Sequence, residues 1–219
     1  MLVTKQNGHN QPLQREKLIN RITPLLKNDI DTTFVNVEAV VDATIKGITE
    51  GIATTRLDEL LCQTAAYLST QHPDYSLLAG RLAVSALHKS TPKSFSAAVD
   101  VLYNYVNPKN KRHSPLITKE LYDIVQANKE VIDNAIQHDR DYTYEYFGFK
   151  TLERSYLIST EESVDGKEAV KRTVERPQYM LMRVSLGIHS TNIERVMETY
   201  DYLSKGMFTH ATPTLYNAG

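Results

Sequence analysis

Few residues in this 219-residue sequence have the type and spacing of nucleophiles, redox centres or metal ligands. Its single cysteine, Cys62, excludes an internal disulfide and any zinc site built from several cysteines. Cys62 follows Leu61 and lies one turn before Ala65 and Ala66 on an apolar helical stripe, so we expect a buried structural thiol rather than a nucleophile or a redox centre. Four histidines lack a companion at the spacing of metal ligands: His72, His113, His138 and His210. We therefore expect no metal site.

The charge and hydropathy patterns exclude several classes of protein. The 25 Lys and Arg residues and the 26 Asp and Glu residues give a net charge of −1, so the chain has no electrostatic basis for binding nucleic acid or a membrane surface. No apolar run approaches the ~20 residues that cross a bilayer. The N-terminus lacks the basic and then apolar layout of a signal peptide. These features favour a cytoplasmic protein.

The first part of the chain predicts a β-hairpin followed by four helices. The strongest hairpin signal is Asn7-Gly8, and Pro12 assigns the returning strand to the edge of a sheet. Apolar residues at helical spacing predict helices at 15–26, from the N-cap Asn36 to Gly51, from Thr54 or Thr55 onwards, and from Pro73 to about Lys89. Pro24 is expected to shorten the first of them. At the start of the third, Thr55 to Asp58 has the pattern of a capping box.

The second part is also predicted to be mostly helical. Partial 3.6-residue periodicity predicts helices at 94–105, 119–128, 130–137, 177–188 and 192–204. A hairpin is expected at 156–174 around Asp165-Gly166, and aromatic residues from Tyr142 to Phe149 are expected to pack in the core and between domains. Residues 208–216 read as a strand that runs into a loop. Because such a strand would leave backbone groups unpaired, we expect a fragment or a separately encoded piece of a longer protein.

Five segments, taken in order, resemble one known family. Residues 3–8 (Val-Thr-Lys-Gln-Asn-Gly), followed by Glu16-Lys17-Leu18, resemble the start of the ATP-cone domain. The strings His-Pro-Asp-Tyr at 72–75 and Ala-Gly-Arg-Leu-Ala at 79–83 resemble its end in ribonucleotide reductase large subunits. More specific are 139–144 with 148–157, 175–178 with 182–184, and 209–219. Together they resemble the eukaryotic-type class I large subunit along essentially the whole chain.

The resemblance implies a mainly α fold in three parts. These are an ATP cone at 1–92, in which a small β-sheet caps a four-helix unit, a helical domain at 93–206, and the first strand of the α/β barrel at 207–219. It implies an enzyme that reduces ribonucleoside diphosphates to deoxyribonucleotides by radical chemistry. In the family the redox-active and radical-bearing cysteines come later, so we expect no catalytic residue here and no activity from this chain alone. The implied partners are the rest of the large subunit, a radical-generating small subunit, thioredoxin or glutaredoxin, and further copies joined through the cone.

The resemblance also implies an allosteric nucleotide site in the cone, which takes ATP as activator or dATP as inhibitor with Mg²⁺. No covalent cofactor is implied. The family pattern assigns to this site Lys5, Gln6, Gln11, Glu16, Lys17, Thr54, Asp58 and Lys89. Lysines suit a triphosphate, and amides at a helix start add donors. Asp58 would accept from a sugar hydroxyl or hold the hydrogen bonds of the site, and so help to distinguish ATP from dATP. Without the resemblance, the lysines read as solvated surface charges and Asp58 as a helix cap.

One further site residue is implied near the end of the chain. The family places a Ser or Thr at the position of Thr212 to contact the substrate. The alternative for Thr212 is a turn-forming threonine before Pro213.

Two other readings remain beside the regulatory one. The family commonly has Lys-Arg-Asp-Gly at 5–8 and Glu at 11, whereas this chain has Gln6, Asn7 and Gln11. A degenerate cone that serves only packing or oligomer contacts therefore stays open. A cone-containing transcriptional regulator would need four zinc-binding cysteines and a basic surface, and the single cysteine and balanced charge argue against it.

Overall fold

The computed structural model describes residues 2–5, 8–27, 29–162 and 169–219. The predicted turn residues Gln6, Asn7, Asp165 and Gly166 lie outside these ranges. The chain divides into two compact units, one of residues 1–86 with 142–150 and the other of 87–141 with 151–219. The predicted domain boundaries at residues 92 and 206 stay predictions.

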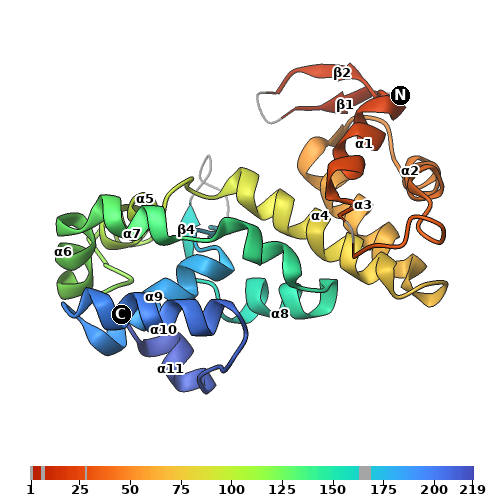
Figure 1. The fold of residues 1–219 in the computed structure, drawn as a ribbon. Coiled ribbons are helices and arrows are strands. Elements are labelled where there is room, and N and C mark those ends of the chain that lie inside the picture. The colour runs from red at the N-terminus through yellow and green to blue at the C-terminus, as the bar shows by residue number, and fades with distance from the viewer. Residues whose placement is uncertain (1, 6–7, 28, 163–168) are drawn as a thin grey trace. The chain divides into compact units, whose positions relative to one another are not determined.

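The first unit contains a three-stranded sheet in the order β2-β1-β3 (Figure 1). β1 (Leu2–Thr4) pairs antiparallel with β2 (Asn10–Pro12), which confirms the hairpin and places Pro12 on the edge. β3 (Ile52–Ala53) pairs parallel with β1 and was not predicted, because two residues carry no periodicity.

The helices of this unit agree with the predicted pattern, apart from the end of the second helix and the capping of the third. They are α1 (Arg15–Ile22), α2 (Val37–Lys46), α3 (Thr54–Tyr67) and the larger part of α4 (Asp74–Ser90), with 3-10 turns at Thr23–Leu25 and Leu68–Thr70. The turn at Thr23–Leu25 contains Pro24, which ends α1 early as expected. The side chain of Asn36 accepts from the amide of Ala39 at 3.0 Å, which confirms the N-cap. The prediction that this helix runs to Gly51 is wrong, because Gly47 ends α2.

The capping box predicted at the start of α3 is also wrong. The N-cap position is Ala53, two residues before Thr55, and no side chain caps this end. Pairing of Ile52 and Ala53 with β1 fixes this start, since the chain passes from strand to helix without a loop. Asp58 therefore lies in the second turn of α3, beyond reach of the capping position.

Apolar faces of these helices form the core of the first unit. The residues buried there include Leu18, Ile22, Val40, Val41, Leu57, Leu61, Ala65, Leu78 and Leu82. Cys62 is 4% exposed, which confirms that its thiol is buried. A close backbone approach occurs at Gly80 of α4, where a Cβ atom would lie 2.3 Å from the carbonyl oxygen of Tyr144. Gly80 thus allows residues 142–150 to pack on α4.

The second unit is built around α9 (Pro177–His189), whose residues from Pro177 to Leu186 are all buried. The other helices are α5 (Phe95–Tyr103), α6 (Lys119–Ala127), α7 (Lys129–Ala135), α10 (Ile193–Ser204) and α11 (Thr212–Asn217), with the 3-10 helix His138–Thr143 and the end of α8 (Tyr146–Ser155). β4 (Ser159–Glu162) and β5 (Val170–Thr173) pair antiparallel, which confirms the two arms of the predicted hairpin.

The strand predicted at 208–216 is wrong. Residues 212–217 form α11, with Pro213 in its first turn, where the fixed φ of proline favours a helix. Amides of Thr214 and Leu215 donate to the carbonyl of Ala211 and close this turn. The aromatic prediction holds for Phe149, which is fully buried, but not for Phe147, which is 82% exposed.

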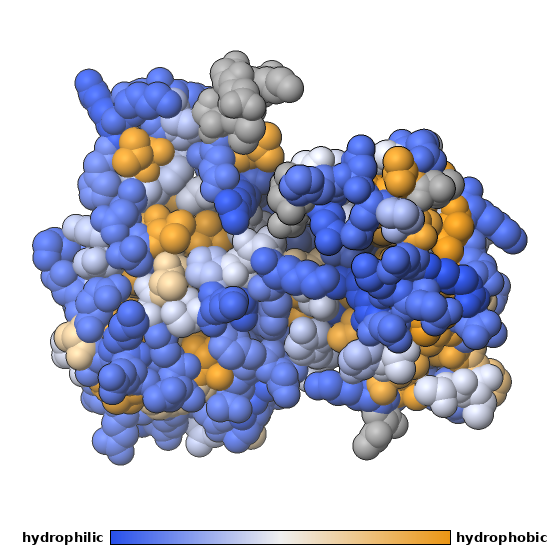
Figure 2. All heavy atoms as spheres, turned by 90° about the horizontal axis from the view of Figure 1, so that it is seen from above, coloured by the Kyte–Doolittle hydropathy of each residue, from blue (hydrophilic) through white to orange (hydrophobic). Residues whose placement is uncertain are grey.

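The face drawn in Figure 2 is mainly hydrophilic, with apolar side chains in small separate patches. Among the described residues, no helix is both long enough and apolar enough to span a membrane.

Candidate functional site

The sheet of the first unit brings two of the predicted site residues to neighbouring positions. Lys5 follows β1 and Thr54 follows β3, and the residues before them, Thr4 and Ala53, are paired in parallel register. Because parallel strands end at the same edge of a sheet, Lys5 and Thr54 leave this edge side by side. Thr54 is also the first residue of α3, so backbone amides without side-chain caps start at this edge.

The β1–β2 hairpin supplies the next residues. The amide of Lys5 donates to the carbonyl of His9 at 2.9 Å, and Gln11 of β2 lies opposite Val3 of β1. Lys5 is exposed and Gln11 is half-buried. Gln6 lies outside the described residues, so its place in the site stays a prediction.

The first turn of α1 carries Glu16 and Lys17, both exposed. The N-cap position, Gln14, makes no side-chain capping bond, which leaves the first amides of α1 uncapped by side chains. Arg15 of this turn pairs instead with Asp42 of α2 at 2.8 Å. Both Arg15 and Asp42 are well exposed, so this pair contributes little to stability.

Asp58 lies one helical turn after Thr54, on the same face of α3. Its carboxylate oxygen Oδ1 is 2.8 Å from Nε of Arg21, on α1. Burial raises the pKa of Asp58 above its ordinary value of 3.8, although the charge of Arg21 opposes this shift. The two side chains are 22% and 13% exposed. Asp58 is therefore a half-buried acid held against a buried guanidinium, not a capping residue.

Lys89 lies in the last turn of α4, within the second unit. There it lines a depression of about 340 Å³ together with residues from the end of α4, the segment after it, α5 and the β4–β5 hairpin: Ser90, Thr91, Pro92, Val101, Thr160, Glu162, Arg172, Thr173 and Val174. Its participation in the nucleotide site stays a prediction.

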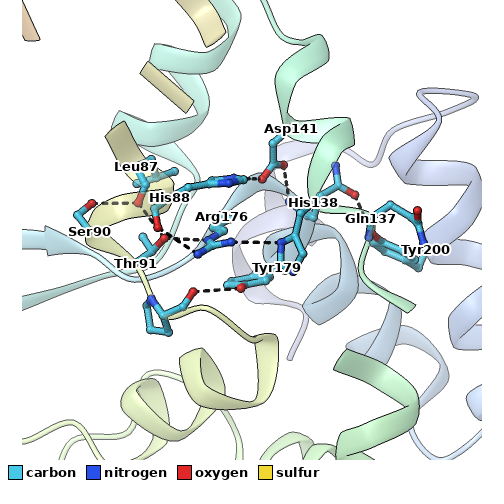
Figure 3. A network of polar contacts seen from close by, with 12 residues as sticks. Leu87, His88, Ser90, Thr91, Gln137, His138, Asp141, Arg176, Tyr179 and Tyr200 are labelled. Carbon is cyan, nitrogen blue, oxygen red and sulfur yellow. Dashed lines mark hydrogen bonds and ion pairs between the residues drawn. The ribbon is translucent and has the colours of Figure 1, made fainter. Parts of the chain in front are cut away.

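A buried polar network surrounds the end of α4 (Figure 3). His88 lies 2.6 Å from one carboxylate oxygen of the fully buried Asp141, and the other accepts from the amide of Gln178 at 3.0 Å. Arg176 donates to Thr91 at 2.9 Å and to the carbonyl of His88 at 3.2 Å. The network thus fixes the backbone beside Lys89.

His138 is the second histidine in the network, with its Nδ1 3.2 Å from Nη1 of Arg176. Burial is the main cause that lowers the pKa of His138 below 6.5, and the charges of Arg176 and His88 add to it. Within the described ranges no three His, Cys, Asp or Glu side chains are grouped as metal ligands would be.

Thr212 begins α11 and is exposed. Its hydroxyl lies 3.1 Å from that of Tyr156, whose ring stacks on Tyr216 with the centroids 5.2 Å apart. Arg183 of α9 donates to the carbonyls of Leu215 and Ala218 at 3.2 and 2.7 Å. Thr212 thus lies at the surface, at the start of α11, and hydrogen bonds from Arg183 hold the later part of this helix against α9.

Comparison with known proteins agrees with this division of sites. Residues 1–90 match the ATP cone domain, and residues 142–219 match the ribonucleotide reductase all-alpha domain. The ribonucleoside-diphosphate reductase large subunit of Trypanosoma brucei brucei is 50% identical over 218 residues, which cover 100% of this chain and 25% of that protein. Those of Danio rerio and vaccinia virus are 49% and 45% identical over 219 residues, covering 26% and 27% of their lengths.

The chain belongs to the ribonucleotide reductase large-subunit family. It spans about a quarter of the length of these relatives. Its ATP-cone match contains Lys5, Thr54 and Asp58, and its all-alpha match contains Thr212.

One residue of the ATP cone that touches a predicted site residue was missed. Arg21 was assigned no role, although it follows Leu18 by three residues and precedes Leu25 by four. That spacing puts a charged residue on the apolar face of α1, where it needs a partner. The signal was therefore present, but the partner, Asp58, is 37 residues away in sequence.

Proposed function

We infer that the ATP cone of this chain binds ATP or dATP with Mg²⁺. The chain forms the N-terminal part of a large subunit that reduces ribonucleoside diphosphates, and nucleotide binding in the cone regulates that reduction. The observation that carries this proposal is the parallel pairing of β1 with β3. It starts Lys5 and Thr54 from one sheet edge, with Asp58 one turn further along α3. A lysine and uncapped helix amides suit the phosphates of a nucleoside triphosphate, and a carboxylate can accept from a sugar hydroxyl.

In this proposal different residues contact different parts of the nucleotide. Lys5 and Lys17 neutralise phosphate charge, and Lys89 adds a third cation. Thr54 and the first amides of α3 donate to phosphate oxygens, while Asp58 accepts from the sugar. Gln6, Gln11 and Glu16 line the remainder of the site, and no cofactor is bound covalently.

The catalytic chemistry belongs to other parts of the proposed assembly. The rest of the large subunit supplies the redox-active cysteines, the small subunit supplies the radical, and thioredoxin or glutaredoxin supplies electrons. Copies associate through the cone in the cytoplasm, and ATP and dATP stabilise different oligomers, which is what makes the effect allosteric. Thr212 contacts the substrate at the entry to the barrel.

A degenerate cone is the second candidate, and a specific observation favours it. Gln6, Asn7 and Gln11 stand where the family commonly has Arg, Asp and Glu, so one cation and two carboxylates are missing.

Calorimetric titration of the folded chain with Mg-ATP and Mg-dATP, beside an Asp58→Asn variant, decides between the two. Saturable binding with a nucleotide preference that the variant reduces supports the regulatory site. No heat and no rise in melting temperature with either nucleotide would refute it in favour of a purely structural segment.

A further inference from the structure

The contact between Arg21 and Asp58 joins α1 to α3 inside the ATP cone. Nε of Arg21 lies 2.8 Å from Oδ1 of Asp58, within ion-pair distance. Yet Nε and Nη2 of Arg21 are buried and have no hydrogen-bond acceptor in suitable geometry among the described residues. For these two nitrogens, attraction to the charge of Asp58 takes the place of a hydrogen bond.

Such an arrangement is a poor way to stabilise a fold. Burying guanidinium donors without acceptors costs free energy, and buried ion pairs are often no more stabilising than apolar residues of similar volume. Desolvation also works against the charged form of Asp58. Stability alone thus gives no reason to hold an arginine at this position.

Geometry connects the pair to the proposed nucleotide site. Asp58 is four residues after Thr54 on α3, so the two side chains lie on one face of the helix, near the sheet edge where Lys5 begins. Asp58 keeps 22% of its side chain exposed, while Arg21 keeps 13%. The carboxylate is thus the more accessible of the two groups, while Nε and Nη2 of Arg21 are buried.

We propose that Arg21 is a positioning residue of the nucleotide site, which holds Asp58 as a fixed, ionised acceptor for one sugar hydroxyl of the nucleotide. An ionised carboxylate only accepts hydrogen bonds, and a sugar hydroxyl donates one. A site that is built to bond a hydroxyl discriminates strongly against the analogue that lacks it. The pair therefore sets the preference between nucleotides that differ at one hydroxyl, and Arg21 acts on it without touching the ligand. This inference rests on the proposed function.

The test is calorimetric titration with Mg-ATP, Mg-dATP and Mg-3′-deoxy-ATP of the wild type and of Arg21→Gln and Arg21→Lys. Two of these ligands each lack one hydroxyl, so they distinguish the 2′ from the 3′ position. Losing a hydrogen bond to a charged group corresponds to roughly a 10- to 100-fold loss of affinity. We expect Arg21→Gln to lose affinity in this range for nucleotides that carry the hydroxyl in question and to change little for the one that lacks it.

Two variants separate this role from a structural one. Arg21→Lys keeps the positive charge and is expected to restore much of the discrimination. Arg81→Gln is the matched control, because Arg81 is another arginine of the first unit whose side chain is mostly covered, but it bonds Asp29 and the carbonyl of Leu25. It is expected to lower stability while leaving the affinity ratios unchanged.

The outcomes separate the two proposals. If the folded wild type binds none of the three nucleotides, the proposed function fails and this inference fails with it. If the wild type discriminates between them and folded Arg21→Gln keeps the same ratios, only the role of Arg21 is overturned. A double variant with Asp58→Asn that loses no more discrimination than either single variant would support action through Asp58.

Discussion

Arg183 and Glu175 form an ion pair inside the second unit, with Nε of the guanidinium 2.6 Å from a carboxylate oxygen and neither side chain more than 2% exposed. The same carboxylate accepts from the amide of Ile158 at 2.9 Å. Since Arg183 also donates to two carbonyls at the end of the chain, this pair ties α9 to the segment before β4 and to α11.

Removing one partner of this pair is expected to destabilise the fold strongly. Glu175→Gln leaves a buried guanidinium without a counter-charge, and breaking a buried pair in this way typically costs about 3–5 kcal/mol of unfolding free energy. Urea unfolding at neutral pH measures it. Removal of an exposed pair by Glu198→Gln, whose partner is Arg195, should cost less than about 1 kcal/mol. Equal losses in the two variants would contradict the importance of burial.

Two glycines of the first unit should respond in opposite directions to alanine. At Gly80 the new Cβ would meet the Tyr144 carbonyl oxygen at 2.3 Å, so the backbone must shift, at a cost of about 1–3 kcal/mol. At Gly148, in α8, the Cβ would enter open space, and the helix should gain about 0.5–1 kcal/mol. Chemical denaturation of both variants checks the prediction, and stabilisation by Gly80→Ala would show that residues 142–150 do not pack on α4 as described.

The network around His138 predicts a dependence of stability on pH. The pKa of His138 is lowered in the folded chain, chiefly by burial, so near and below pH 6.5 the unfolded chain binds more protons at this residue. Stability should consequently fall as the pH is lowered through about 6.5. Melting temperatures between pH 5.5 and 7.5 should fall less for His138→Gln than for the wild type. His113→Gln, at an exposed histidine, should follow the wild type.

The N-cap of α2 gives a prediction of moderate size. Asn36→Ala removes the acceptor of the Ala39 amide and should cost about 1 kcal/mol. Asn20→Ala replaces an exposed asparagine inside α1 and should be neutral or slightly stabilising, because alanine has the higher helix propensity. Denaturant midpoints of the two variants should therefore move apart. Equal midpoints would mean that the cap contributes nothing.

Local elements and the family could be predicted from the amino-acid sequence. Helical periodicity, the Asn36 cap and the effect of Pro24 depend on residues close together in the chain, and the structure confirms them. The order of five motifs identified the family, and the ATP-cone and all-alpha matches agree with it.

Contacts between residues far apart in the sequence could not be predicted in this way, because they depend on how the elements pack. β3 is too short to have a periodicity of its own and exists because β1 lies beside it. Asp58 has the spacing of a helix cap, but its carboxylate instead lies 2.8 Å from Nε of Arg21 on α1. Because both side chains are mostly covered, water screens their attraction little, and the carboxylate pairs with Arg21 rather than capping α3. Contacts with distant residues also decide the conformation of residues 212–217. The pattern at 208–216 favoured a strand, whereas the turn around Pro213 and the bonds from Arg183 to Leu215 and Ala218 hold it as a helix.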